Sequence, residues 1–165
     1  MSAARSCTEA PGLSTTGKLE FRILANHHDH AQLISRANAE PESERLQDAG
    51  GQLLAWWVPV QDAAGKWIGQ VEHIATRTVT RGDREVLEVL VVKDPFDVNG
   101  SDLKRVTLDT DDLGKPCIAF AFASSGAQRF GELTGSNLPD SAQGVYRHLG
   151  IIIDGEVSSA PRIMS

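Results

Sequence analysis

The sequence predicts an α+β fold, a mainly antiparallel sheet with two or three helices packed on it. Apolar side chains alternate with small or polar ones in Leu19–Leu24 and Cys117–Phe122, a period of two that is typical of strands. Asp154-Gly155 separates two further strand-like runs and offers a positive φ at two adjacent positions, which is the strongest short hairpin signal. Residues 125–135 have helical spacing instead. Hairpins combined with a few helices are the α+β pattern.

Length and charge narrow the choice of function. The chain has 165 residues, as expected of one domain, and 41% of them are hydrophobic, enough for a core. It carries 16 basic and 22 acidic residues, a net charge of −6, and its scattered Lys and Arg argue against a nucleic-acid partner. No apolar run approaches the roughly 20 residues of a membrane helix. We expect residues 1–17 to be a disordered or vector-derived lead and residues 18–165 to be the domain.

The first half of the domain is expected to alternate strands and short helices. Leu19–Leu24 reads as a half-buried strand, and Asp29 as the cap of a helix over residues 31–37 with Leu33, Ile34 and Ala37 inside. Residues 41–46 indicate a second short helix that stops at Gly50-Gly51. Residues 52–60 form a strand with Trp56 and Trp57 on opposite faces, so core packing explains one of them and the other is a candidate for a contact surface.

The middle of the chain predicts hairpins. Residues 66–79 fit both a helical and a strand pattern, and we expect a strand from about His73 that turns at Arg81-Gly82-Asp83-Arg84 and returns over residues 85–92. Asp94-Pro95 ends that strand, and Asn99-Gly100-Ser101 is read as a turn although it is a formal glycosylation sequon. A strand over residues 103–109 then leads to the strand at Cys117.

The last third carries the clearest local signals. Ser125 and Gln128 have the spacing of a capping box, Phe130 and Leu133 form an apolar stripe, and Gly135 is the expected stop. Gly131 inside this helix suggests close packing. The apolar run 149–153 is expected to be covered on both faces. Pro161 belongs on an edge strand or at a strand end because it cannot donate to a ladder.

Catalytic chemistry finds little support in the sequence. It has no nucleophile elbow, phosphate-binding loop, zinc-protease helix or Cys-x-x-Cys pair, so we expect neither an enzyme nor a cofactor. His27, His28 and His30 invite a metal site that His73 and His148 would have to complete, but adjacent helical residues point apart, so a polar turn is the favoured interpretation. Cys7 and Cys117 form a disulfide only in an oxidising compartment, and two separate thiols are favoured.

One stretch also resembles a known family. GAQRFGELTGSN followed by LGIIIDGEVSSAPRI is similar to the head part of the first large periplasmic domain of the SecD/SecDF protein-export family, and GKLEFRILA and VNGSDLKRVTLD fit in the same order. The residues that match the family motif are Gly126, Ala127, Phe130, Thr134, Asp154, Gly155, Val157, Ser159, Ala160 and Pro161. The family is anchored by transmembrane helices, which this sequence lacks, so the resemblance implies a fragment of a larger membrane protein.

The resemblance implies a role in protein export. The parent would lie in the inner membrane with this domain on the periplasmic side, and its partners would be SecF, the Sec translocon channel and unfolded preprotein. The groove expected to contact polypeptide is bordered by Trp56 or Trp57, Phe130 and Pro161. Two alternatives stay open: a periplasmic small-ligand or metal-binding module that uses His27, His28 and His30, and a structural spacer that docks on translocon partners.

Overall fold

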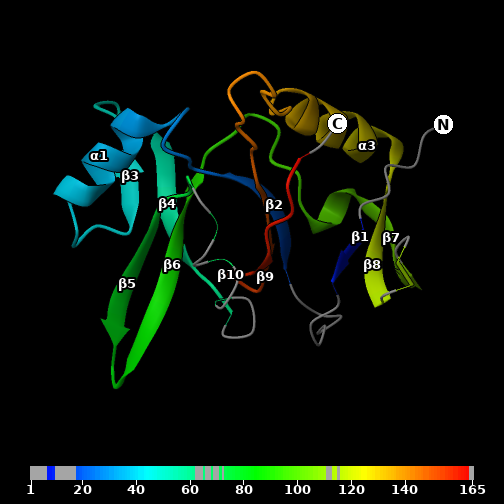
Figure 1. Cartoon of the computed structure of the whole chain (residues 1–165), viewed down its shortest axis with the longest axis horizontal. Coiled ribbons are helices and arrows are strands. Elements are labelled where there is room, and N and C mark those ends of the chain that lie inside the picture. The colour runs from blue at the N-terminus through cyan, green and yellow to red at the C-terminus, as the bar shows by residue number, and fades with distance from the viewer. Residues whose placement is uncertain are drawn as a thin grey trace.

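A computed structural model of the chain describes residues 7–9, 18–61, 65, 68, 71, 73–110, 113–114 and 116–163. Two α-helices and two antiparallel sheets make up this part of the chain, as the α+β prediction required (Figure 1). In chain order the elements are β1 Cys7–Glu9, β2 Leu19–Leu24, α1 Ala31–Ala39, β3 Arg45–Gln47, β4 Leu53–Pro59, β5 Thr76–Arg81, β6 Arg84–Val92, the 3-10 helix η1 Gly100–Asp102, β7 Leu103–Thr110, β8 Pro116–Phe122, α3 Ser124–Gly135, β9 Leu149–Ile153 and β10 Glu156–Ser159. No helix in these described ranges is long and apolar enough to cross a membrane.

The larger sheet has the strand order β10-β9-β2-β6-β4-β3, and β5 pairs with β6 beside this path. β2 therefore lies in the middle of the sheet, and its last four residues are buried rather than half-exposed. β9 lies between β10 and β2, and its first four residues are all buried, which confirms the prediction of a strand covered on both faces. The smaller sheet has the order β1-β8-β7.

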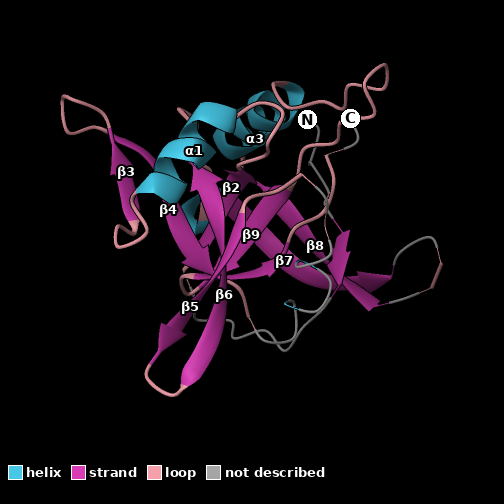
Figure 2. Ribbon diagram, turned by 60° about the vertical axis from the view of Figure 1, so that its left-hand side comes forward, coloured by secondary structure: helices cyan, strands magenta, loops and turns pink. Residues whose placement is uncertain are grey.

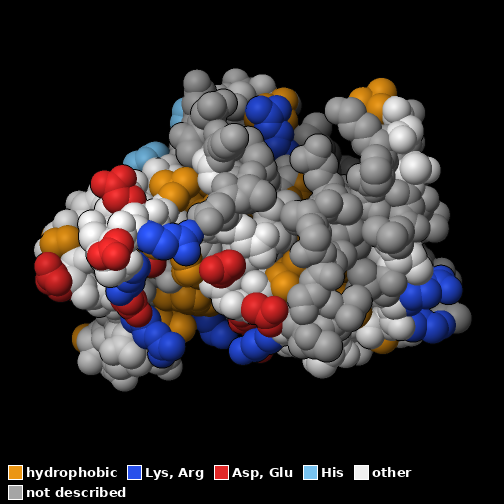
Figure 3. Space-filling model, turned by 90° about the horizontal axis from the view of Figure 1, so that it is seen from below, with side chains coloured by type: hydrophobic (Ala, Val, Ile, Leu, Met, Phe, Trp, Pro, Cys, Tyr) orange, Lys and Arg blue, Asp and Glu red, His pale blue; other side chains and the backbone are white. Residues whose placement is uncertain are grey.

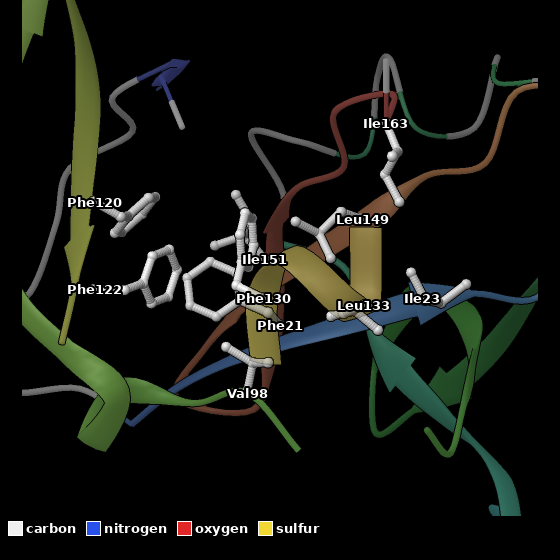
Figure 4. Close-up of a cluster of buried hydrophobic side chains, with 10 residues drawn as sticks. All are labelled: Phe21, Ile23, Val98, Phe120, Phe122, Phe130, Leu133, Leu149, Ile151 and Ile163. Atoms are coloured by element: carbon white, nitrogen blue, oxygen red, sulfur yellow. The ribbon is translucent and has the colours of Figure 1, made fainter. Parts of the chain in front are cut away.

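An aromatic cluster holds the two sheets and α3 together. Figure 4 shows side chains from β2, β8, β9 and α3 converging on one another. The Phe21 ring of the larger sheet lies 5.4 Å from the Phe120 ring and 5.5 Å from the Phe122 ring of the smaller sheet. Phe122 stacks on Phe130 of α3 at 4.6 Å. Because large rings bury the most apolar surface per residue, this cluster is the main attachment of α3 and the smaller sheet.

Two more clusters lie on the opposite faces of β4 and β6. One contains Ile34 and Ala37 of α1 with Trp57 and Leu90, so the predicted inner face of α1 is confirmed. The other contains buried side chains of β2, β6, β9 and β10, and Trp56 packs against it. The two adjacent tryptophans thus face opposite sides of β4, as predicted, but both pack against a core.

The predicted short helix over residues 41–46 is wrong. After a turn, Arg45–Gln47 forms β3, which pairs with β4, and Leu46 is fully buried opposite Ala55. The Asp48 carboxylate accepts hydrogen bonds from the N–H groups of Gly50 and Gln52, at 2.8 and 2.9 Å, and closes the hairpin. Burial of Leu46 in the sheet overrides the weak helical propensity of this stretch.

Both predicted helix caps are also wrong. α1 has His30 at its N-cap, and α3 starts at Ser124 after Ala123, with no side-chain cap hydrogen bond at either start. Ala123 N–H instead donates to Asp102 O at 2.8 Å, so a tertiary contact determines where α3 begins. The predicted stop, Gly135, is the last residue of α3.

The lead and the cysteines are only partly described. The backbone of Cys7–Glu9 pairs with β8, in a register that places Glu9 opposite Cys117 and Cys7 opposite Ala119. The other residues of the expected lead, and most of the ambiguous residues 66–72, lie outside the described ranges.

Candidate functional site

The four residues predicted to border one groove do not lie together. Trp57 and Phe130 are 6% and 8% exposed and belong to different core clusters. Trp56 is half-buried under Arg22, whose Cζ lies 5.4 Å from the ring centroid. Pro161 lies two residues after the end of β10 and is also half-buried. Trp57 and Phe130 are therefore core side chains rather than contact residues.

The β10 edge of the larger sheet is not open either. Val60 forms a parallel bridge with Val157, and Gln61 N–H donates to Val157 O at 3.0 Å. The pairing of β10 with β9 also shifts register between Val157 and Ser159. Pro161 accepts a hydrogen bond from Leu149 N–H at 2.9 Å, so this end of the chain is tied into the sheet.

The motif residues in α3 have packing roles. A Cβ placed on Gly126 would stand 2.6 Å from Asp102 Cβ and from Asp102 O, so only glycine lets α3 approach η1 this closely. Phe130 packs in the aromatic cluster with Ala127 against it. Thr134 Oγ1 donates to Phe130 O at 3.0 Å. Gly131, which was expected to be closely packed, is exposed and has nothing near its side-chain position.

The motif residues at the C-terminal end form the predicted hairpin. Asp154 and Gly155 have φ values of 53° and 81°, as a tight turn of this type requires. Asp154 Oδ1 also accepts from Lys18 N–H at 2.9 Å, which ties the turn to the start of β2. Val157, Ser159 and Ala160 are buried on the returning strand or just after it.

The histidine cluster is organised by an ion pair. The Asp29 carboxylate receives two hydrogen bonds from Arg147, at 2.7 and 2.8 Å, and these bonds hold its pKa well below the usual range. His30 Nδ1 accepts from Asn26 N–H at 3.1 Å, while His27 and His28 are exposed. In the described part of the chain no three His, Cys, Asp or Glu residues converge as metal ligands. The metal-binding alternative is therefore not supported.

His148 directly follows Arg147 and immediately precedes β9. Its side chain is buried, and burial lowers its pKa to about 4. Burial disfavours the charged imidazolium, so the folded chain favours the neutral imidazole at neutral pH.

A buried arginine is the feature that sequence reasoning missed. Arg22, 5% exposed, donates to Asp97 at 2.6 Å and to Glu20 at 3.1 Å, and its Nη1 lies 3.7 Å from Asp94 Oδ2. Burial opposes the charge, but the carboxylate hydrogen bonds outweigh it and raise the pKa of Arg22. The contacts with Asp94 and Asp97 attach the segment between β6 and η1 to β2. The strand pattern placed Arg22 on the solvent-facing side. Its burial depends on Asp94 and Asp97, which are distant in the sequence and could not be paired with it from a local pattern.

A second arginine fastens the same segment to α3. Arg129 donates to Phe96 O at 2.8 Å and to the buried carboxylate of Asp102. Asp102 Oδ2 in turn accepts from Asn99 N–H at 3.0 Å, and Asn99 caps η1. The predicted turn at Asn99 is thus confirmed as a capped 3-10 turn.

The β5–β6 hairpin extends beyond the rest of the larger sheet, as Figures 1 and 2 show from two directions. Its turn at Gly82, where φ is 64°, confirms the predicted hairpin. Arg77 pairs with buried Glu88 at 2.8 Å, and its Cζ lies 4.5 Å from the Trp57 ring centroid. Arg81 pairs with Glu44 at 2.6 Å. In the view from below, the acidic and basic side chains drawn in colour are interspersed rather than separated into patches (Figure 3).

Comparison with known proteins identifies this unit. The protein-family model for the SecDF P1 head subdomain matches residues 75–165, from the residue before β5 to the end of the chain. The chain belongs to the SecDF family. This confirms the resemblance stated from the α3 motif and the Asp154-Gly155 hairpin.

Related proteins extend the likeness upstream. The protein translocase subunit SecD of Elusimicrobium minutum is 39% identical over 154 residues, which are 93% of this chain and 28% of that protein. The protein translocase subunit SecDF of Thermus thermophilus is 30% identical over 132 residues, 76% of this chain and 17% of that protein. This chain is also similar to a solved structure of SecDF, described as a membrane component that enhances protein export. The two share 22% identity with a TM-score of 0.42, and the match covers 95% of this chain and 59% of the SecDF chain. The chain thus spans less than a third of the length of the SecD of Elusimicrobium minutum and of the SecDF of Thermus thermophilus.

Proposed function

We propose that this chain is the extracytoplasmic P1 domain of a Sec translocon accessory subunit and that it contacts unfolded polypeptide as it emerges from the channel. The match of residues 75–165 to the SecDF P1 head subdomain is the observation that carries the proposal. The relatives in Elusimicrobium minutum and Thermus thermophilus are named as protein translocase subunits, which supports an export role for the parent. We further propose that the parent lies in the inner membrane, with this domain on the periplasmic side.

The partners follow from that placement. SecF and the Sec translocon channel would lie next to the parent, and the preprotein would be the transient partner. An unfolded chain offers free backbone N–H and C=O groups and scattered side chains, so a surface that accepts it needs little sequence preference. The charged side chains drawn in colour in Figure 3 are of both signs and interspersed, and this is consistent with such tolerance, because those described residues do not select a segment of one charge.

The proposal assigns the chain no enzymatic role. The described groups with the most perturbed pKa values are Asp29, held by Arg147, and His148, buried in the sheet. Both are engaged in structure, and neither adjoins a nucleophile in the contacts described above. The binding of polypeptide, rather than a reaction, is therefore the activity to measure.

A titration tests the proposal. The 165-residue chain, labelled with ¹⁵N, is titrated with reduced and carbamidomethylated α-lactalbumin, which stays unfolded in buffer. We expect saturable amide shifts confined to one surface, and no shifts with native α-lactalbumin as the matched control. Absence of any shift with the unfolded probe would contradict polypeptide contact. If the chain then still captured translocon subunits in a pull-down, the spacer alternative would replace it.

A further inference from the structure

We infer that the outer edge of β5, at Thr76, Thr78 and Thr80, is where an extended polypeptide adds to the larger sheet as another strand. This inference rests on the function proposed above and names the surface that would perform it. The occupant is the backbone of an unfolded segment, and its chemistry is that of main-chain N–H and C=O groups. Peptide addition to a sheet edge gives affinity through such groups without requiring a particular sequence.

Hydrogen bonds around β6 fix the orientation of the hairpin backbone. Leu90 N–H donates to Ala75 O, just before β5, at 3.1 Å, and Val60 N–H donates to Leu87 O, on the β4 side, at 2.8 Å. Backbone groups of successive strand residues point to opposite sides. The even-numbered residues of β6 therefore direct their groups toward β5, and the odd-numbered residues direct theirs toward β4.

The register then identifies the backbone groups of β5 that do not face β6. Arg77 and Val79 lie opposite even-numbered residues of β6, so their N–H and C=O groups bond to β6. The groups of Thr76, Thr78 and Thr80 consequently point away from β6. The side chains of all three threonines are exposed, and β6 is the strand that pairs with β5 among the described elements.

β5 also differs from the other described edges. β1 and β3 have three residues each, and β3 also has a register shift between Leu46 and Gln47. The β10 edge is closed by Val60, as described above, and β7 has a register shift between Leu103 and Arg105. β5 pairs with β6 over six residues without a shift. A long and regular edge is the template that an added strand needs.

The charged side chains that usually protect a strand edge do not block the edge of β5. Natural edges are blunted by charged side chains, proline or bulges, and β5 has two arginines but neither of the other devices. Arg77 lies against Trp57 and Glu88, and Arg81 is paired with Glu44, so both charges are held by partners on the sheet face that carries α1. The threonines between them are uncharged. An approaching strand therefore meets no unpaired charge from β5.

A second copy of this chain is the less suitable occupant. Each copy carries a net charge of −6, so two edges brought together repel. An unfolded segment in transit brings no such fixed field. The charge balance therefore favours a foreign extended chain over self-association.

Two substitutions at one position test the inference. Thr78→Pro deletes an N–H that points outward, so the β5–β6 bonds are retained, as is tolerated on an edge strand. Thr78→Val keeps the N–H and changes only the hydroxyl. Binding of fluorescent reduced and carbamidomethylated α-lactalbumin is followed by anisotropy for both variants and the unchanged chain. We expect Thr78→Pro to weaken binding by about tenfold, through loss of a hydrogen bond and obstruction of the edge, and Thr78→Val to bind within about twofold.

A second measurement on the unchanged chain does not depend on how Thr78→Pro folds. The bound probe should slow hydrogen exchange at the amides of Thr76, Thr78 and Thr80 and leave those of the exposed α3 residues Glu132 and Gly135 unaffected. Binding that protects other amides, or that Thr78→Pro leaves unchanged in a folded variant, would overturn this inference while the proposed function stands. No binding by the unchanged chain would overturn both. Concentration-dependent dimerisation that Thr78→Pro abolishes would assign the edge to a second copy and overturn the inference.

Discussion

Gly126 lies directly against Asp102, because a Cβ at position 126 would stand 2.6 Å from the Cβ and the carbonyl oxygen of Asp102. This contact seats α3 on η1, and the Arg129–Asp102 ion pair lies beside it. The motif glycine is therefore explained by packing.

Substituting Gly126 tests this explanation. Gly126→Ala should destabilise the chain by about 1–3 kcal/mol, because the added methyl group meets backbone that must shift. Gly131→Ala is the matched control in the same helix, where nothing lies near the side-chain position. It should stabilise by about 0.5–1 kcal/mol through helix propensity. Urea denaturation measures both, and equal effects of the two substitutions would refute the close approach.

The Arg129–Asp102 pair should be strongly coupled. Arg129→Ala leaves the buried Asp102 carboxylate without its cationic partner and removes the hydrogen bond to Phe96 O, so we expect a loss of about 2 kcal/mol or more. A double-mutant cycle with Asp102→Asn isolates the pair. A coupling energy near zero would show that the two residues do not stabilise each other.

His148 should make stability depend on pH. Its pKa is lowered from 6.5 to about 4 by burial, so the unfolded chain binds the proton more readily than the folded chain. The stabilisation is fully present above pH 6.5 and is lost as pH falls toward 4, and this loss amounts to about 3 kcal/mol. Replacement by glutamine should flatten the fall in unfolding free energy between pH 6.5 and 4. The pKa of His30 is also lowered by burial, so His30 accounts for part of the pH dependence that remains in this variant.

The Asp29–Arg147 pair should make the unfolding free energy depend on pH at more acidic values than His148 does. Arg147 holds the Asp29 pKa below its ordinary value of 3.8, so the pair stabilises the fold above that pH and is lost as pH falls below it. Asp29→Asn should lower the unfolding free energy by about 1–2 kcal/mol at neutral pH. The difference from the unchanged chain should shrink below pH 3.8. A difference that stays constant down to pH 2 would contradict the assignment.

The sequence predicted elements whose chemistry is local. Asp154-Gly155 and the turn at Gly82 require positive φ, and that requirement can be recognised from the residues alone. Strand alternation placed β8 correctly, and the continuous apolar run over residues 149–153 placed β9. The apolar stripe of α3 was found at Phe130 and Leu133. The family motif in the last third was recognisable because it consists of such local signals.

What the sequence failed to predict depends on distant partners. Asp29 was read as a helix cap, but its partner Arg147 lies 118 positions away. Arg22 was read as solvent-facing, but Asp97 lies 75 positions away and draws it into a buried cluster. A local pattern contains no information about such pairings. The same holds for Phe130, whose aromatic partners on β2 and β8 make it a core residue.

Site-specific photo-crosslinking during export tests the central claim most directly. A photoreactive residue replaces Thr78 in a full-length SecD-family subunit that carries this domain, and a second version carries it at Glu132, exposed on α3. While a preprotein is being translocated, we expect illumination to join position 78 to the preprotein and to leave position 132 unreacted. Crosslinking at position 132 alone, or at neither position, would contradict polypeptide contact at the β5 edge.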